Sequence, residues 1–183
     1  MWIFYNHIPE KSHIRIVPPN IIFHCFMAFK LDSIDRKILE ILQANAKITN
    51  AQLSKDVGLS PAPTLERVKK LETAGLIKSY HAQLDTEKIG LGVTTFVQVT
   101  LVGHRKSYID AFVRKISDID EIIECHHITG SGDFLLKVIT KDIPAYQKLM
   151  LEKINEIEEV DSTPSMVILS TFKDSKVLPI PAE

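Results

Sequence analysis

The chain has 183 residues, which is enough for two domains of ordinary size with an apolar core in each. Apolar residues make up 45% of the sequence and charged residues 25%, a balance typical of globular proteins, and the formal net charge is −1. No apolar run approaches the roughly 18 residues of a membrane-spanning helix, which argues against an integral membrane protein. Cys25 and Cys125 form no pair with metal-binding or redox spacing, which indicates a reduced, cytoplasmic setting.

Residues 1–28 are interpreted as an N-terminal extension outside any domain. They mix apolar residues with prolines and scattered charges, and they show no sustained helical periodicity. A secretory signal peptide would need a basic start, a continuous apolar block and a small-residue cleavage site, which do not occur here in that order. Our hypothesis is that translation starts at Met27 rather than Met1, because a well-patterned helix follows Met27 directly. The alternative is an additional strand over residues 21–26.

Residues 29–85 carry the pattern of a domain built from three short helices. Asp32 is placed to cap the first helix, and Asp35 lies in its first turn, where a carboxylate faces the positive end of the helix dipole. Apolar residues then recur at helical spacing over residues 34–42 and predict one buried face.

The second helix is predicted to begin at a capping box over residues 49–52. In this arrangement the Thr49 hydroxyl and the Gln52 side chain would each satisfy a backbone amide group of the first turn. Leu53 and Val57 supply the apolar stripe. Gly58 follows where the chain must leave the helix, a position that often needs left-handed backbone and therefore favours glycine.

The third helix is predicted to begin after Ser60, which acts as its cap, with Pro61 at the first position, where its missing amide costs nothing. A helical wheel places these residues on the side away from the core: Pro63, Glu66, Arg67, Lys70 and Ala74. The first turn of such a helix can enter the major groove of DNA. Residues 29–90 hold ten Lys and Arg against eight Asp and Glu, an excess of positive charge too small to indicate DNA binding by itself. The alternative to a DNA-binding surface is therefore that this basic side is only exposed to solvent.

Residues 76–85 alternate between apolar and polar side chains after Gly75, as the edge of a hairpin would. This pattern predicts the winged variant of the helix-turn-helix. Residues 86–92 are then expected to form a linker to a second domain.

Residues 93–176 predict a second domain of alternating strands and helices, followed by a C-terminal tail over residues 177–183. The expected strands cover residues 93–102, 121–128, 134–140 and 165–172, and the expected helices carry apolar stripes over residues 109–116 and 146–157. The order βαββαβ is that of a ferredoxin-like sandwich with its helices on one face of the sheet. The fold class is therefore α+β, a winged helix-turn-helix followed by a ferredoxin-like domain.

The other face of this sheet needs a cover. Phe96, Val138 and Met166, or the residues that alternate with them, could provide it between two subunits, so we expect a dimer.

No metal site, cofactor site or catalytic centre is predicted. His126 and His127 are adjacent on a strand and point to opposite faces, so they cannot bind one metal ion together. Cys125 and His127 share a face but lack further ligands, which favours a buried structural pair. A phosphate-binding loop, a dinucleotide fingerprint and a nucleophile with an adjacent base are also missing from the sequence. We therefore expect that the protein is not an enzyme.

Several segments closely resemble the Lrp/AsnC (leucine-responsive regulatory protein) family of transcription regulators. In the first domain they are residues 31–39 (LDSIDRKIL), 53–63 (LSKDVGLSPAP) and 65–72 (LERVKKLE). In the second domain they are residues 124–127 (ECHH) and 130–137 (GSGDFLLK). The resemblance spans residues 31–173 and places the helix-turn-helix over residues 50–69.

The resemblance implies binding to double-stranded DNA through the second and third helices. The positions that it marks as DNA-binding are Asn50, Ser60, Pro61, Ala62, Pro63, Thr64, Arg67, Lys69 and Lys70. It also implies a homodimer or a larger homo-oligomer such as an octamer. Two recognition helices of a dimer would then contact half-sites about one DNA turn apart.

The resemblance further implies a small effector, usually an amino acid, bound at the glycine-containing turn of the second domain. The positions concerned are Thr129, Gly130, Ser131, Gly132 and Asp133. Backbone amides around glycines can hold a carboxylate, and Asp133 could balance an ammonium group. The alternative is a plain hairpin turn, for which Gly and Asp are favourable residues. Ser131 and Gly132 depart from the leucine-type pattern, so leucine is not singled out as the effector.

Three functional classes follow from these observations. The first is a sequence-specific transcription regulator that responds to a small effector. The second is an architectural DNA-wrapping protein of the same fold without an effector. The third is an enzyme of amino-acid metabolism with a regulatory ferredoxin-like domain, for which the sequence offers no catalytic constellation. The first class agrees best with both halves of the chain.

Overall fold

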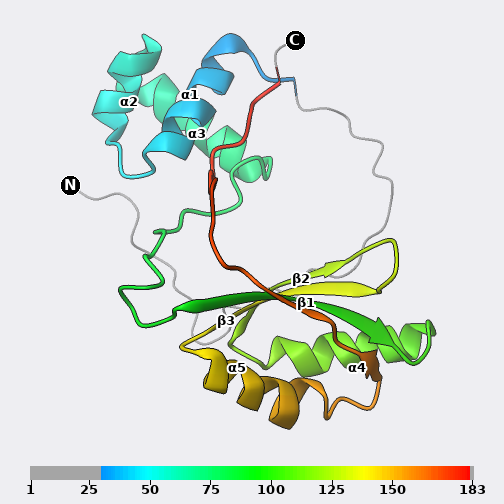
Figure 1. The fold of residues 1–183 in the computed structure, drawn as a ribbon. Coiled ribbons are helices and arrows are strands. Elements are labelled where there is room, and N and C mark those ends of the chain that lie inside the picture. Colours follow the sequence, from blue (N-terminus) through cyan, green and yellow to red (C-terminus); the bar gives the residue numbers. More distant parts are fainter. Residues whose placement is uncertain (1–29, 182–183) are drawn as a thin grey trace. The chain divides into compact units, whose positions relative to one another are not determined.

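The computed structural model describes residues 30–181, which form two compact units (Figure 1). Within this range, the helical unit contains residues 30–83 together with residues 171–181, and the sheet unit contains residues 84–170. The expectations for residues 1–28, including a start at Met27, lie outside the described residues. Among residues 30–181, the helices fall short of the length and apolarity that crossing a bilayer requires.

The helical unit is a three-helix arrangement, as the sequence predicts. Its helices are α1 (Ser33–Ala44), α2 (Asn50–Val57) and α3 (Pro61–Thr73). The core between them consists of one face from each helix: Ile38, Leu53, Val57, Val68 and Leu71. Burial of these side chains supplies most of the stability of helices this short, because isolated helices of 8 to 13 residues are marginal in water.

The first two helix starts differ in how completely their caps form. At α1, the Asp32 carboxylate accepts a hydrogen bond from the Asp35 amide at 2.8 Å, and the Asp35 carboxylate accepts one from the Asp32 amide. At α2, the Thr49 hydroxyl accepts from the Gln52 amide, but the Gln52 side chain donates to Asp56 at 2.7 Å. The predicted reciprocal box at α2 is therefore only half formed, because a charged acceptor one turn along the helix binds the Gln52 amide group instead.

The hairpin predicted over residues 76–85 is wrong for this structure, in which these residues form no strand. Their alternating pattern lacks a pairing partner among the described residues of the helical unit, and a β-ladder needs two strands. Local contacts hold the segment against α3: the Leu76 and Ile77 amides donate to the Leu71 carbonyl, and the Tyr80 hydroxyl donates to Glu72 at 2.8 Å.

The sheet unit confirms the predicted order of its first four elements. They are β1 (Val93–Leu101), α4 (Lys106–Ser117), β2 (Ile122–His127) and β3 (Phe134–Thr140). The second helical stripe begins as α5 (Ile143–Leu149) and continues as one π-helical segment, η1 (Met150–Ile154). The strands pair in the order β2-β3-β1-β4, all antiparallel, as in a ferredoxin-like sandwich.

The predicted last strand over residues 165–172 is replaced by two shorter strands. These are β4 (Val160–Ser162) and β5 (Ser165–Val167), and both pair with β1. From residue 171 onward the chain belongs to the helical unit. The contacts of residues 171–176 thus group them with the helical unit, whereas the sequence-based boundary of the second domain lies at residue 176.

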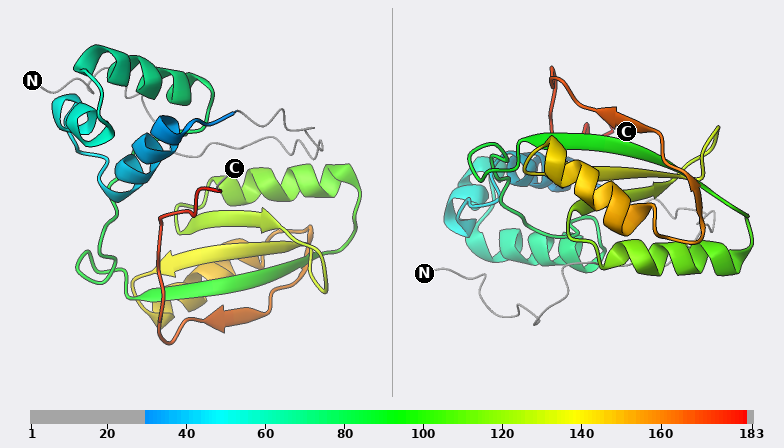
Figure 2. Two further views of the ribbon diagram at one scale, coloured as in Figure 1. Left: turned by 90° about the horizontal axis from the view of Figure 1, so that it is seen from above. Right: turned by 60° about the horizontal axis from the view of Figure 1, so that its bottom comes forward.

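One face of the sheet carries both α4 and α5, and the left view of Figure 2 looks onto the opposite face. Alternate residues of β1 and β3 point to the helices and are buried, among them Val97, Leu136 and Val138. Val138 therefore lies in the core rather than on the uncovered face, which corrects its predicted role. Phe96, by contrast, is paired with Met166 of β5 on the other face, where Met166 is 52% exposed.

Candidate DNA-binding and effector sites

The turn between α2 and α3 is held by a glycine and by one side-chain bridge. Gly58 ends α2 with a φ of 74°, the left-handed conformation that its position predicted. The Asn50 side chain at the start of α2 donates to the Pro61 carbonyl at 2.8 Å. Asn50 therefore positions the first turn of α3, a structural role that the resemblance alone did not reveal.

The first turn of α3 presents an exposed surface of small, rigid residues. Ser60 occupies the cap position and Pro61 the first helical position, as predicted, but the Ser60 hydroxyl makes no capping hydrogen bond. Ser60, Pro61, Ala62 and Pro63 are all exposed. Small side chains at this end of a helix allow its backbone to approach a DNA duplex closely.

The remaining predicted positions on α3 fall into two groups. Lys69 and Lys70 are exposed. Thr64 is fully buried, and its hydroxyl donates to the Ser60 carbonyl at 3.0 Å. Thr64 therefore has no surface to offer DNA, so we remove it from the predicted contacts. Its β-branched side chain faces the core because it lies one turn before Val68 on the same face of the helix.

Arg67 joins α3 to the start of α1. Its Nη1 atom lies 2.6 Å from Asp32 Oδ2 and 2.7 Å from Asp35 Oδ1. The Asp35 side chain is 6% exposed, whereas the Asp32 side chain is 50% exposed. Asp32, Asp35 and Arg67 thus form one charged network that joins the start of α1 to the middle of α3. Arg67 was predicted to point outward, but in the structure it makes a contact between two helices.

The network shifts the pKa values of Asp32 and Arg67. The Asp35 amide, and next the Arg67 guanidinium, hold the pKa of Asp32 below its usual value. The two carboxylates, Asp32 first, raise the pKa of Arg67. From the sequence, Asp32 and Asp35 were expected to act only within α1, through capping and through the helix dipole. Their contact with Arg67 was not foreseeable, because Arg67 lies 35 residues after Asp32 and 32 residues after Asp35 in the chain.

In the sheet unit, the predicted effector turn lies against the end of β1. Asp133 follows the turn, and its backbone amide donates to the Val99 carbonyl at 2.9 Å. The Asp133 carboxylate accepts from the Leu101 amide at 2.8 Å and lies 3.2 Å from the His104 ring. Asp133 therefore fixes the turn to β1 and to the loop after it, and we revise its role from balancing an ammonium group to positioning.

The turn itself is divided between exposed and enclosed residues. Thr129, Gly130 and Ser131 are exposed, and Gly130 has a φ of 122°, which favours glycine. Gly132 is enclosed: a Cβ atom there would lie 2.5 Å from Cγ of Gln98. Gln98 also donates to the Ser131 hydroxyl at 3.2 Å. Gln98 is thus a residue of this site that sequence reasoning missed, although its polar side chain interrupts an apolar strand.

The buried pair predicted for Cys125 and His127 is wrong for this structure, in which both residues are exposed. His127 stacks on Phe134 with ring centroids 5.0 Å apart. Desolvation of the Cys125 thiol by its surroundings raises its pKa to about 11, so the thiol stays protonated at neutral pH. Within residues 30–181, no group of three or more His, Cys, Asp and Glu side chains is arranged to hold a metal ion.

A helix-turn-helix with an exposed recognition helix, joined to a ferredoxin-like unit, defines a DNA-binding regulator with a separate ligand-binding domain. Two family models match the chain in this order. The model for winged helix-turn-helix DNA-binding domains matches residues 31–78, and the model for the Lrp/AsnC ligand binding domain matches residues 94–178. The chain belongs to the Lrp/AsnC family of transcription regulators, and its relatives are regulators rather than enzymes.

Relatives and solved structures agree with this assignment. The leucine-responsive regulatory protein of Haemophilus influenzae is 40% identical over 148 residues, which covers 81% of this chain and 89% of that protein. A transcriptional regulator of Neisseria meningitidis in complex with L-methionine superposes with a TM-score of 0.79 at 34% identity, covering 82% of this chain and 97% of that one. A feast or famine regulatory protein from M. tuberculosis, complexed with L-methionine, gives a TM-score of 0.74 at 28% identity over 81% and 99% of the two chains.

Proposed function

We propose that this regulator contacts DNA through the first turn and the basic side of α3. Ser60, Pro61, Ala62 and Pro63 would face the major groove, and Lys69 and Lys70 would contact phosphates. The observation that carries the proposal is the exposure of Ser60 to Pro63 at the start of α3, directly after the Gly58 turn. The regulator would then act in the cytoplasm of a bacterial or archaeal cell, where its DNA lies.

The salt dependence of DNA binding tests this proposal. Fluorescence anisotropy with DNA from upstream of the protein's own gene would be measured between 50 and 300 mM salt, where an electrostatic interface gives a linear log–log plot. Lys69→Ala and Lys70→Ala should each lower the slope by about one if they contact phosphate. Lys148→Ala, an exposed lysine of the sheet unit, is the matched control. Wild-type slopes for both α3 variants would remove these lysines from the interface.

We also propose that an amino acid binds at the exposed part of the turn, Thr129 to Ser131. Two structural neighbours are complexes with L-methionine, which makes this amino acid the first compound to examine. Isothermal titration calorimetry against each of the twenty amino acids should give saturable heat for at least one of them, and bound ligand should raise the unfolding temperature. A complete lack of response would favour the alternative, an architectural DNA-wrapping protein without an effector.

The uncovered face of the sheet supports the proposal that the protein is a homodimer or a larger homo-oligomer, such as an octamer. Phe96 and the neighbouring Leu135 and Ile139 are half-buried there, and Met166 is exposed. An apolar face of this kind is normally covered by a second subunit. Native mass spectrometry of wild type and Leu135→Lys should show loss of the dimer in the variant. A variant with unchanged assembly would place the interface elsewhere.

A further inference from the structure

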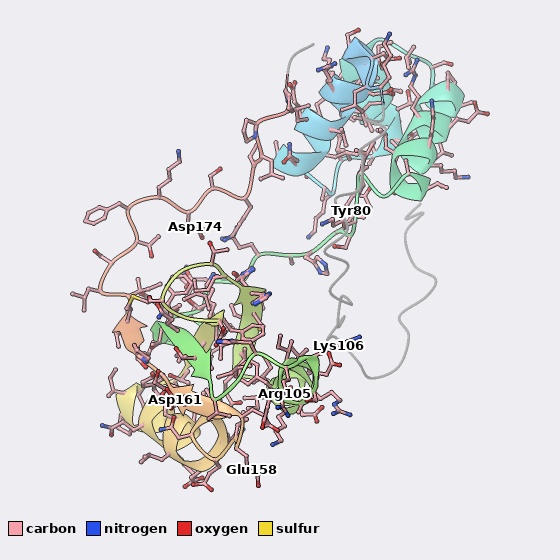
Figure 3. The ribbon with its side chains drawn as sticks, turned by 90° about the vertical axis from the view of Figure 1, so that its right-hand side faces the viewer. Tyr80, Arg105, Lys106, Glu158, Asp161 and Asp174 are labelled. Atoms are coloured by element: carbon pink, nitrogen blue, oxygen red, sulfur yellow. The ribbon has the colours of Figure 1, made fainter. Side chains whose placement is uncertain are left out.

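The C-terminal segment makes specific contacts with α1. The side-chain amide of Gln43 binds both polar backbone groups of Leu178: its Nε2 atom donates to the Leu178 carbonyl at 3.2 Å, and its Oε1 atom accepts from the Leu178 amide at 2.7 Å. Arg36 Nη1 donates to the Pro181 carbonyl. Arg36 and Gln43 are seven residues apart and therefore share one face of the helix. In Figure 3 the segment can be followed from the labelled Asp174 to α1.

The sequence of this segment suits a docked, extended peptide. Residues 177–181 read Val-Leu-Pro-Ile-Pro, so Leu178 and Ile180 each precede a proline, which disfavours helical backbone at both. The two prolines also fix their own φ angles and bring no amide donor that would need a partner. Such a segment loses little conformational entropy when it docks, because it is already extended in the free chain.

The burial of one residue and one further contact indicate that the segment is part of the helical unit. Ile180 is half-buried, unlike Leu178, which is 71% exposed. Upstream, the Gln83 side chain donates to Asp174 at 3.2 Å. The chain before the segment is anchored in the sheet unit, since the Ile168 amide, next to β5, donates to the Thr94 carbonyl of β1 at 2.9 Å.

We propose that residues 177–181, here called the C-terminal strap, bind α1 of the DNA-binding domain through Gln43 and Arg36 and stabilise that helix. The strap also gives this domain a second connection to the sheet unit. The first connection is the linker after α3. A domain attached at two points has fewer positions open to it than a domain on one linker, so the strap restricts movement of the DNA-binding domain. These contacts form in the free chain, without DNA or an effector.

Hydrogen exchange of backbone amides in full-length protein tests the docking. A chain ending at Lys176, and the full-length variant Gln43→Ala, should both exchange faster in the second half of α1, by roughly fivefold for each hydrogen bond lost. Lys37→Ala is the matched control, because Lys37 is exposed on the same helix about 100° around its axis from Arg36. Unchanged exchange in both Gln43→Ala and the truncated chain would overturn the proposal.

A synthetic peptide of residues 175–183 separates docking from tethering. Added to the truncated chain, it should restore slow exchange in α1, because the contacts form equally well in trans. It should not restore the restricted movement, because it is not joined to the sheet unit. Rotational correlation times from NMR relaxation should therefore differ between the two units in the truncated chain, with or without peptide, and agree more closely in wild type. Identical correlation times in both chains would reject the second connection.

Discussion

Replacement of Arg67 by alanine distinguishes a contact between helices from a contact with DNA. The guanidinium lies 2.6 Å from Asp32 and 2.7 Å from Asp35, and the Asp35 side chain is only 6% exposed. Removing one partner of a buried pair costs roughly 3 to 5 kcal/mol, and an exposed pair is worth about 1 kcal/mol or less. Because Arg67 itself is 31% exposed, water would partly replace it, so we expect Arg67→Ala to lower the free energy of unfolding by about 2–3 kcal/mol.

The assay is urea unfolding followed by circular dichroism at 222 nm, with the double variant Arg67→Ala/Asp35→Ala as the internal control. Removing the Asp35 carboxylate as well takes away the uncompensated charge. The double variant should therefore be more stable than the sum of the two single changes predicts, with a coupling of about 1–2 kcal/mol. Arg67→Lys should retain part of the stability, since one ammonium group cannot reproduce the geometry of a guanidinium.

DNA binding by the same variants gives the second readout. If Arg67 positions α3, Arg67→Ala should weaken binding at every salt concentration while the log–log slope stays at its wild-type value. If Arg67 contacts a phosphate, the slope should fall by about one and the free energy of unfolding should change little. Wild-type stability together with a reduced slope would refute the reasoning and return Arg67 to the DNA interface.

Three other substitutions test the turns and the network. Gly58→Ala should destabilise the helical unit by about 1 kcal/mol in urea unfolding, because its φ of +74° strains an alanine although open space surrounds the new Cβ. Gly58→Asn should lose less stability, since asparagine tolerates this conformation better. Equal losses of stability in the two variants would argue against backbone strain. Gly132→Ala should cost about 1–3 kcal/mol through its clash with Gln98, and the added change Gln98→Ala should recover part of this; a double variant no better than Gly132→Ala would contradict that cause. The lowered pKa of Asp32 means that its contribution to stability is complete above about pH 4 and is lost as the pH falls through the lower folded value. Asp32→Asn should therefore lower the unfolding midpoint at pH 7 and flatten its decline below pH 4, whereas an unchanged acid profile would exclude Asp32 as the titrating group.

The recognition helix shows how far sequence reasoning about the site could reach. Its start at Pro61, the glycine before it and the outward position of Pro63 were predicted, since they depend on neighbouring residues. The burial of Thr64 and the contacts of Arg67 with Asp32 and Asp35 were not predicted. A helical wheel ranks positions by angle, and it cannot say which of the borderline positions another helix will cover.

The effector turn shows the same division. Its two flanking strands were predicted within one residue, from alternation and from the Gly-rich turn between them. The enclosure of Gly132 by Gln98 and the use of the Asp133 carboxylate by Leu101 come from β1, some thirty residues earlier in the chain. No local pattern contains that information.

The sequence by itself determined the helices, most of the strands, the two-domain order and the family, because periodicity, caps and turn residues act over a few neighbouring positions. The tertiary structure decided which charges meet, which face of the sheet Val138 lies on, and that the chain after β5 returns to α1. These outcomes depend on contacts between residues that are 32 to 145 positions apart. Packing in three dimensions selects such partners, and their spacing along the chain carries no signal of it.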